Sequence, residues 1–152
     1  MTPELPERYL DDFAVGEVFT TPGYTFTEAD IIGFALQYDP QSFHLDIEAG
    51  ARSPYGGLIA SGFHTAVICF RLFIQGGLLG ASSLGSPGID ELRWLTPVRP
   101  GDTLHTRVEV LDVHPSRSKP DRGILQLRYA AVNQRGETAL TFILNHLLAR
   151  RG

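Results

Sequence analysis

Residues 63–74 read FHTAVICFRLFI, and within this stretch only His64, Thr65 and Arg71 are plainly polar. Together with its neighbours, from about residue 59 to residue 75, the stretch predicts the main helix of the chain. A helix that is apolar on nearly every side must be surrounded by protein. The apolar run is too short to span a bilayer and contains Arg71, so we expect no insertion into a membrane.

The chain after this helix is strand-like. Over residues 104–110, apolar and polar side chains alternate, which is the period of a sheet with one covered face. A second alternating stretch lies at 125–129, and a turn at 133–136 leads into a last strand over 138–148, which predicts a hairpin. We also expect an opening strand over 18–26.

A short helix is expected between the opening strand and the main helix. Thr27 is a suitable N-cap, and the helix should end near Tyr38 because Pro40 disfavours helical backbone at Asp39. Irregular backbone is expected from Asp39 to the start of the main helix. The glycine-rich residues 76–88 are expected to form a mobile loop, near the mouth of any pocket.

These elements predict the architecture of the chain. A curved antiparallel sheet wrapped around one long central helix buries that helix on several sides, which a flat sheet could not do. This is the α+β hot-dog fold. Because there is no internal repeat, low-complexity tract or long linker, we expect one domain over residues 1–152.

Composition excludes several functional classes. The formal net charge is −4 and the basic residues are scattered, so nucleic acid is not an expected partner. Cys69 is the single cysteine, which excludes a disulfide framework and a paired-cysteine metal motif. Residues 1–7 lack the basic and apolar segments of a secretory signal, so we expect a cytoplasmic protein.

Two residue pairs are candidates for chemistry. Asp39 and His44 place a carboxylate and an imidazole five residues apart between two helices; the alternative is a turn-forming aspartate and a structural histidine. Ser61 and Gly62 lie near the start of the main helix, where free amides can bind an oxyanion. Alternatively, Ser61 is only an N-cap and Gly62 only a close-packing residue.

Three spaced motifs together resemble the MaoC-like family of acyl-thioester dehydratases and (R)-specific enoyl-CoA hydratases. The family's Asp-x-Asn-Pro-x-His stands here as residues 39–44, Gly62 is similar to its helix-start glycine, and residues 97–102 are similar to its Pro-Val-x-x-Gly-Asp turn. The resemblance covers roughly residues 12–148. This chain departs from the family where Gln41 and Ser42 replace Asn-Pro, and where Ser61 replaces a common histidine.

The resemblance implies a reaction at an acyl thioester, carried by coenzyme A or by acyl carrier protein. Asp39 and His44 would add or remove water across C2 and C3, while the Gly62 amide, with Ser61 beside it, would hold the thioester oxygen. No metal and no separate cofactor is expected. The alternatives are a hot-dog thioesterase and a non-catalytic acyl-thioester-binding module. Hot-dog subunits usually pair, so we expect at least a homodimer.

We expect ordinary structural roles for most of the other polar residues. His64 is expected to be a packed helical histidine, and His105, His114 and His146 lack the spacing of a zinc site. Cys69 is expected to be an inert core thiol. A basic loop, defined as Arg117, Lys119 and Arg122, is either a solvated turn or a contact for coenzyme A phosphates.

Overall fold

The computed structural model describes residues 6–152; residues 1–5, on which part of the expectation of a cytoplasmic protein rests, lie outside them. An antiparallel sheet runs in the order β1-β4-β5-β6-β3, and β2 also pairs with β4. The strands are β1 Val18–Thr20, β2 Tyr24–Thr25, β3 Gly88–Trp94, β4 Thr103–Pro115, β5 Arg122–Val132 and β6 Thr138–Ala149.

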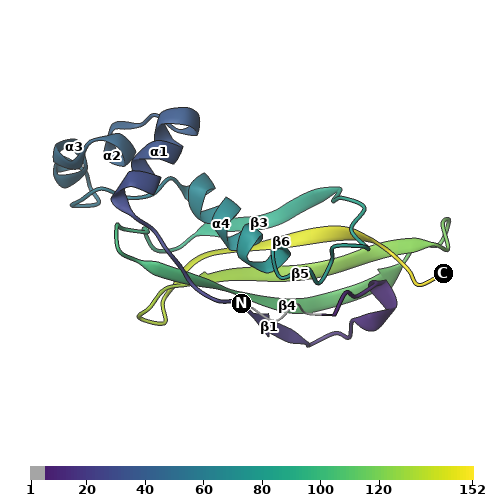
Figure 1. Ribbon diagram of the computed structural model, residues 1–152. Helices are drawn as coiled ribbons and strands as arrows, with labels where there is room; N and C mark the ends of the chain where they lie inside the picture. Colours follow the sequence, from purple (N-terminus) through teal and green to yellow (C-terminus); the bar gives the residue numbers. More distant parts are fainter. Residues whose placement is uncertain (1–5) are drawn as a thin grey trace.

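The helices lie on one side of this sheet. They are the 3-10 turn η1 Leu10–Asp12, then α1 Glu28–Tyr38, α2 Ser42–Leu45, α3 Ile47–Arg52 and α4 Gly62–Ile74. Figure 1 shows α4 lying along the sheet, with α1, α2 and α3 grouped beyond one of its ends. The predicted α+β hot-dog fold is confirmed, with α4 as its central helix.

The core lies between α4 and the strands behind it. Apolar side chains alternate with more exposed ones along β4 and β5, as the sequence period predicts. Its members from α4, β4 and β5 include Ile68, Cys69, Leu72, Phe73, Leu104, Val108, Val110, Leu125, Leu127 and Tyr129. This packing fixes the position of α4, and therefore of its first turn, on the rigid sheet.

The start of the central helix differs from the prediction. The helix begins at Gly62 and not near Ile59, because the preceding residues are tied to other segments. The Ile59 amide donates to the Phe43 carbonyl at 3.2 Å, and the Ala60 amide donates to the Val98 carbonyl at 2.8 Å. These bonds join the two residues to neighbouring segments, and Ser61, with ψ 138°, is the non-helical cap after which the helix starts.

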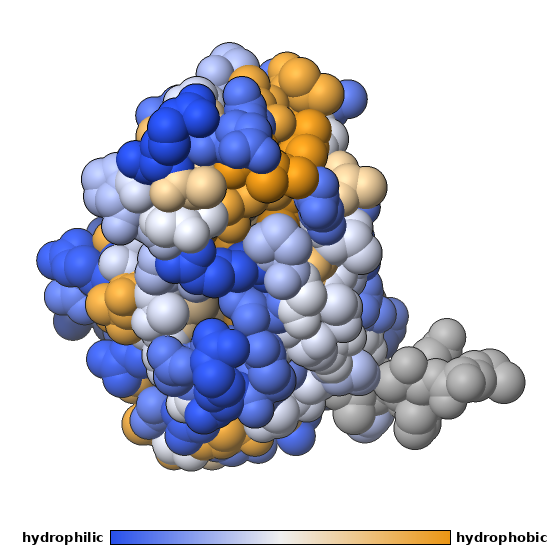
Figure 2. All heavy atoms as spheres, turned by 90° about the vertical axis from the view of Figure 1, so that its left-hand side faces the viewer, coloured by the Kyte–Doolittle hydropathy of each residue, from blue (hydrophilic) through white to orange (hydrophobic). Residues whose placement is uncertain are grey.

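The central helix is not surrounded by protein on all sides. Phe63, Val67 and Phe70, spaced along one stripe of α4, are 59%, 52% and 37% exposed. The expectation that this helix is fully enclosed is therefore wrong for the single chain. Figure 2 shows apolar side chains gathered near the top of the face that carries α1–α3, above a largely hydrophilic lower part.

Two segments differ from the prediction: the opening strand is interrupted, and the segment after Asp39 is helical in part. The opening strand is two short strands, because residues 21–23 contain Pro22, which has no amide to donate to the ladder. The segment expected to be irregular instead contains α2 and α3. Asp46 caps α3, since its carboxylate accepts hydrogen bonds from the amides of Glu48 and Ala49.

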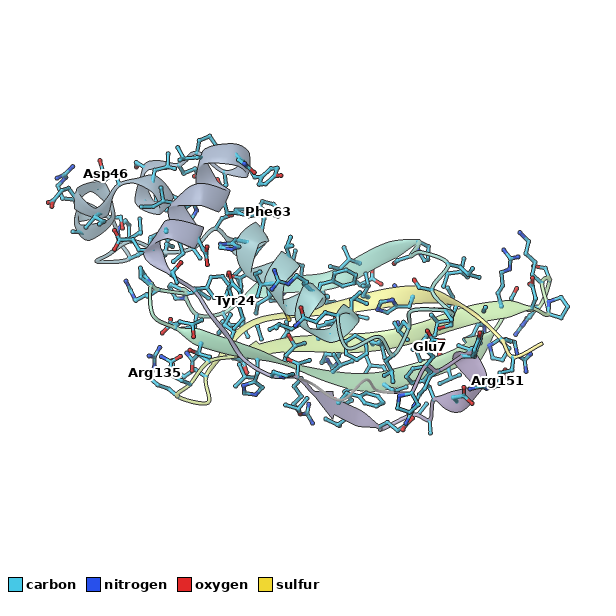
Figure 3. All side chains as sticks on the ribbon, in the orientation of Figure 1. Glu7, Tyr24, Asp46, Phe63, Arg135 and Arg151 are labelled. Atoms are coloured by element: carbon cyan, nitrogen blue, oxygen red, sulfur yellow. The ribbon has the colours of Figure 1, made fainter. Side chains whose placement is uncertain are left out.

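The glycine-rich segment 76–88 does not lie at the pocket described below. It follows the carboxyl end of α4, and Leu78, Leu79 and Ser82 within it are buried. Its backbone is hydrogen-bonded to β6 through Leu84 and Leu147. Figure 3 shows the length of the molecule, with Asp46 and Phe63 toward one end and Glu7 and Arg151 toward the other.

Candidate active site

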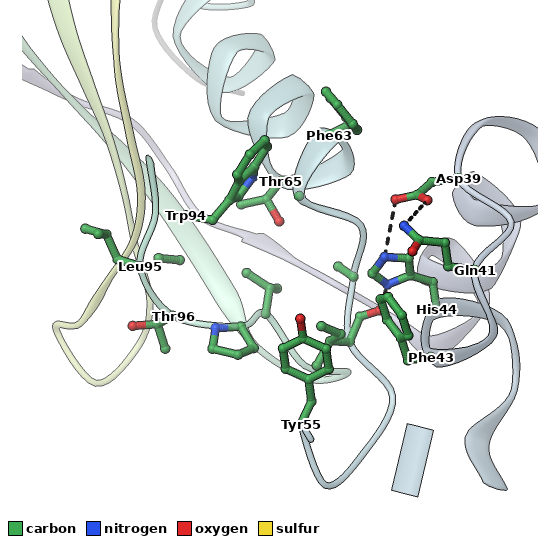
Figure 4. A pocket seen from close by; sticks show the side chains of 16 residues that line it. Asp39, Gln41, Phe43, His44, Tyr55, Phe63, Thr65, Trp94, Leu95 and Thr96 are labelled. Carbon is green, nitrogen blue, oxygen red and sulfur yellow. Dashed lines mark hydrogen bonds and ion pairs between the residues drawn. The ribbon is translucent and has the colours of Figure 1, made fainter. Parts of the chain in front are cut away.

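A cavity of about 520 Å³ opens where the first turn of α4 meets the α1–α2 connection and the chain leaving β3. Its walls are mostly apolar, with a few polar groups on one side. Figure 4 shows Asp39, Gln41 and His44 on that side, and Trp94 and Leu95 across from them. Its main apolar and aromatic lining residues are Phe43, Tyr55, Ile59, Ala60, Phe63, Trp94, Leu95, Pro97, Val98 and Ala139. Such a site suits a ligand with an apolar chain and one reactive group.

Asp39 occupies the C-cap of α1. Its amide still donates to the Ala35 carbonyl at 3.0 Å, but its own backbone has left the helical region, and Pro40 follows. The helix therefore ends at the residue the sequence predicts. The Asp39 side chain is only 14% exposed and points at the first turn of α4.

His44 lies in α2 and is 4% exposed. Its Nδ1 is 2.7 Å from the carbonyl oxygen of Ile59. Because a carbonyl oxygen can only accept a hydrogen bond, Nδ1 carries a proton, and Nε2 is the nitrogen free to gain or lose one. Nε2 lies 3.3 Å from Oδ2 of Asp39. The structure thus brings the two predicted residues together.

Two further side chains hold the Asp39 carboxylate. Ser61 Oγ donates to Oδ2 and Gln41 Nε2 donates to Oδ1, each at 2.7 Å. Burial alone would raise the pKa of Asp39, but the hydrogen bonds from Ser61 and Gln41 and the proximity of His44 lower it below its usual value. Asp39 is therefore a carboxylate at neutral pH.

Ser61 and Gly62 form the start of α4. Ser61 is fully buried, and its Oγ both caps the helix, accepting from the Phe63 amide at 3.3 Å, and donates to Asp39. The capping interpretation is correct but incomplete, because the same hydroxyl orients the carboxylate. Gly62 lines the cavity, and its amide is one of the first-turn donors that no helical carbonyl can satisfy.

The sequence did not single out two residues of the site. Gln41 appeared only as a departure from the family motif, yet its position two residues after Asp39 is close enough for a side-chain hydrogen bond. Trp94 lines the cavity from the end of β3, and no local pattern in the sequence indicates which way that side chain faces. The contacts of Trp94 depend on how distant segments pack.

Other polar residues lie outside this site. His64 is buried and stacks on Phe34, with ring centroids 4.6 Å apart, as expected of a packed helical histidine. Cys69 is buried, which raises the pKa of its thiol to about 12 and keeps it protonated. The basic loop is in the β4–β5 hairpin, at the far end of the sheet from α1–α3 (Figure 1).

Residues 6–152 contain neither a grouped set of metal ligands nor a helix that could span a membrane. No three histidine, cysteine, aspartate or glutamate side chains in this part of the chain are grouped so that they could hold a metal ion. None of its helices has both the length and the apolar character needed to cross a bilayer.

Comparison with known proteins identifies the family of this chain. A model of the MaoC-like domain matches residues 12–128. The uncharacterized protein YdeM of Bacillus subtilis is 37% identical over 126 residues, covering 83% of this chain and 88% of YdeM. The 3-hydroxybutyryl-CoA dehydratase of Methylorubrum extorquens is 33% identical over 129 residues, covering 78% of this chain and 74% of that enzyme.

A solved structure extends the similarity to three dimensions. The crystal structure of the MaoC-like dehydratase from Rhodospirillum rubrum superposes with a TM-score of 0.89 at 42% identity. The superposition covers 95% of this chain and 99% of the other. The resemblance seen in the sequence motifs is confirmed.

Proposed function

This chain belongs to the MaoC-like family of hydratases and dehydratases, and from that premise we propose that it adds water to trans-2-enoyl thioesters or, in reverse, dehydrates 3-hydroxyacyl thioesters. The observation that carries this proposal is the Asp39–His44 pair at the wall of an apolar cavity. The name of the Methylorubrum relative, a 3-hydroxybutyryl-CoA dehydratase, supports an acyl-CoA substrate.

The chemistry assigned to the pair is a balanced addition. Asp39 and His44 hold one water molecule beside C3. The water oxygen bonds to C3 while one of its protons passes to the pair, the C2=C3 π electrons move toward the thioester oxygen, and the pair returns a proton to C2. A positioned acid or base contributes about 10²- to 10⁴-fold to such a step.

The start of α4 is assigned to stabilise the negative charge that develops on the intermediate. As C3 gains its oxygen, the thioester oxygen becomes enolate-like and negative. The Gly62 amide lies in the cavity wall at the positive end of the helix dipole and is assigned the donor role. Ser61 is assigned a positioning role, since its hydroxyl is already committed to Asp39.

We propose coenzyme A or acyl carrier protein as the carrier of the acyl group. The reaction moves no electrons between substrate and protein, so its balance requires no redox cofactor. The apolar lining, with Phe43, Tyr55 and Leu95, suits an acyl chain. The basic loop lies at the opposite end of the sheet from α1–α3 and does not line this pocket.

A panel of trans-2-enoyl-CoA thioesters tests the proposal. Enoyl absorbance and free thiol are followed together for the parent protein, Asp39→Asn, His44→Ala and the control His114→Ala, which changes an exposed histidine in β4. We expect absorbance loss without thiol release, abolished in the two site variants and kept in the control. Thiol release would instead indicate a thioesterase, and a folded but inactive parent a binding module.

We also propose that the chain forms a homodimer. Within residues 6–152, β3 lies at an end of the sheet and pairs with β6 alone, so its other edge is open there, and Ile89 on it is 47% exposed. The exposed stripe of α4, defined above as Phe63, Val67 and Phe70, adds apolar surface. An open strand edge and an apolar helical stripe are features that a second copy of the chain can cover.

A further inference from the structure

Strand β3 contains one extra residue just before the site. Asp90 pairs with Ile143 of β6 and Arg93 pairs with Thr141, so three steps along β3 match two along β6. Glu91, inside this bulge, has φ 51°, the only positive φ at a non-glycine position among residues 6–152. Left-handed backbone at a side chain of this kind is uncommon and is kept only where the surroundings enforce it.

The bulge decides which side chain faces the helix. Because side chains alternate along a strand, one extra residue reverses every later position. Beyond the bulge, Trp94 pairs with Leu140, which is fully buried, and Arg93 pairs with the less buried Thr141. Without the extra residue, Arg93 would take the inward position. The bulge therefore points an indole, and not a guanidinium, at the first turn of α4.

The Trp94 indole packs directly on Gly62. A Cβ atom at Gly62 would lie 2.8 Å from Cδ1 of Trp94 and closer still to Nε1 and Cε2. The indole thus covers the Cα of the residue whose amide lines the pocket. Phe63 holds the ring from a second side in an edge-to-face contact, with centroids 5.7 Å apart.

Both N–H groups at this point have no acceptor within the described chain. The hydrogen bonds among residues 6–152 include none donated by the Gly62 amide or by Trp94 Nε1. Both residues line the cavity, and Trp94 is 49% exposed. Figure 4 shows Trp94 across the pocket from Asp39 and His44, so a substrate carbon held by the pair would lie between them and the indole.

We propose that the Trp94 indole N–H is a second donor to the thioester oxygen, beside the Gly62 amide. This inference rests on the proposed hydratase function and names a further residue that touches the reacting group. Two donors at one developing oxyanion stabilise it more than one donor does. The β3 bulge at Glu91 is then the device that puts the indole in place.

Trp94→Phe tests the proposal, because it keeps an aromatic ring and removes the N–H. We expect kcat for enoyl-CoA hydration to fall on the order of 10²-fold with little change in KM, as for a donor used mainly in the transition state. The control Arg93→Gln changes the neighbouring residue on the opposite side of β3 and should retain kcat. Circular dichroism and thermal melting check that both variants fold as the parent does.

A binding measurement distinguishes a hydrogen bond donated by Trp94 from a role of Trp94 in packing alone. Butyryl-CoA with a ¹³C-labelled carbonyl is saturated and cannot be hydrated, so its infrared carbonyl band reports only the hydrogen bonds at that oxygen. We expect the band of the bound ligand to lie at higher frequency in Trp94→Phe than in the parent. Trp94 is the only tryptophan of the chain, so in the parent and in Arg93→Gln its fluorescence reports occupancy of the pocket.

The possible outcomes separate the two proposals. An active parent together with a Trp94→Phe variant of unchanged kcat and unchanged carbonyl band would overturn the donor role and leave the hydratase function standing. A change only in acyl-chain preference would overturn it as well. A parent that binds butyryl-CoA but hydrates nothing would refute the proposed function, while the carbonyl band would still decide whether Trp94 donates.

Discussion

At the scale of single residues, the pair Asp39 and His44 could be named from the sequence, but its partners could not. The motif spacing indicated the carboxylate and the imidazole, and the structure places Oδ2 of Asp39 3.3 Å from Nε2 of His44. The bond from Ser61 to Asp39 joins residues 22 positions apart. Only the packing of α1 against the start of α4 creates it, so local patterns contain no signal for it.

Removing the Ser61 hydroxyl should move the pH dependence of activity. Burial raises the pKa of Asp39, and the Ser61 hydrogen bond is the largest influence that lowers it. In Ser61→Ala that pKa should rise, so the acidic limb of the kcat profile, where the base becomes protonated, should shift to higher pH. Activity measured across pH 4–8, a range of about four units around typical carboxyl and imidazole pKa values, tests this.

Gln41→Ala is the matched comparison for Ser61→Ala. It removes the other hydrogen bond to the Asp39 carboxylate but leaves the N-cap of α4 intact, since that cap is Ser61. Its acidic limb should shift in the same direction by less, because the Gln41 side chain is exposed and its bond is screened. Profiles that coincide with the parent in both variants would show that neither bond sets the basicity of Asp39.

At the scale of elements, periodic pattern predicted the long strands and the central helix, and it failed where tertiary contacts decide. Helix α4 starts three residues later than the pattern suggests because Ile59 and Ala60 are bound to other segments. The bulge at Glu91 leaves no mark in the sequence, since the residue with left-handed backbone is a glutamate and not the glycine that this backbone favours. That bulge sets the direction of the Trp94 side chain. The sequence therefore misses Trp94 as a site residue for the same reason that it misses the bulge.

A buried histidine between β5 and β6 predicts that the folded protein loses stability in acid. His146 on β6 is 3% exposed, and its Nε2 lies 2.7 Å from the Tyr129 hydroxyl of β5. Burial lowers the pKa of His146 to about 4. The unfolded chain therefore takes up a proton near pH 6.5 that the folded chain refuses until about pH 4, so stability should fall over that window, by roughly 3 kcal/mol in total.

Chemical denaturation at a series of pH values measures this dependence. In His146→Gln, which keeps a polar partner for Tyr129, the slope of unfolding free energy between pH 6.5 and 4 should be reduced. His114→Gln removes an exposed histidine from β4 and should keep the parental slope. Equal slopes in the parent and His146→Gln would mean that His146 is protonated in the folded protein and that its burial is relieved.

At the scale of the whole molecule, the sequence predicted the architecture because one apolar helix and several alternating strands have few ways to share a core. It did not predict that one stripe of that helix is open. The exposed Val67 lies on this stripe, away from the pocket lining. The apolar residues of this helix thus form two surfaces. One packs against the sheet, and we assign the other to contact with a second copy of the chain.

Val67→Asp should therefore weaken the dimer while leaving the fold intact. A carboxylate placed in an apolar contact between subunits must be desolvated, which opposes association. Size-exclusion chromatography with light scattering should show a dimer for the parent and a shift toward monomer for the variant. Val15→Asp places the same charge at an exposed valine elsewhere and should remain dimeric. A monomeric parent at micromolar concentration would refute the homodimer.

The central claim is that the Asp39–His44 pair adds water across C2 and C3 of an enoyl thioester. The most direct test is to incubate crotonyl-CoA with the protein in H₂¹⁸O and, separately, in D₂O, and to analyse the product by mass spectrometry and NMR. We predict ¹⁸O at C3, one deuteron at C2, an intact thioester, and no incorporation with Asp39→Asn. Incorporation of ¹⁸O into a free carboxylate with release of thiol, or equal hydration by Asp39→Asn, would contradict the account.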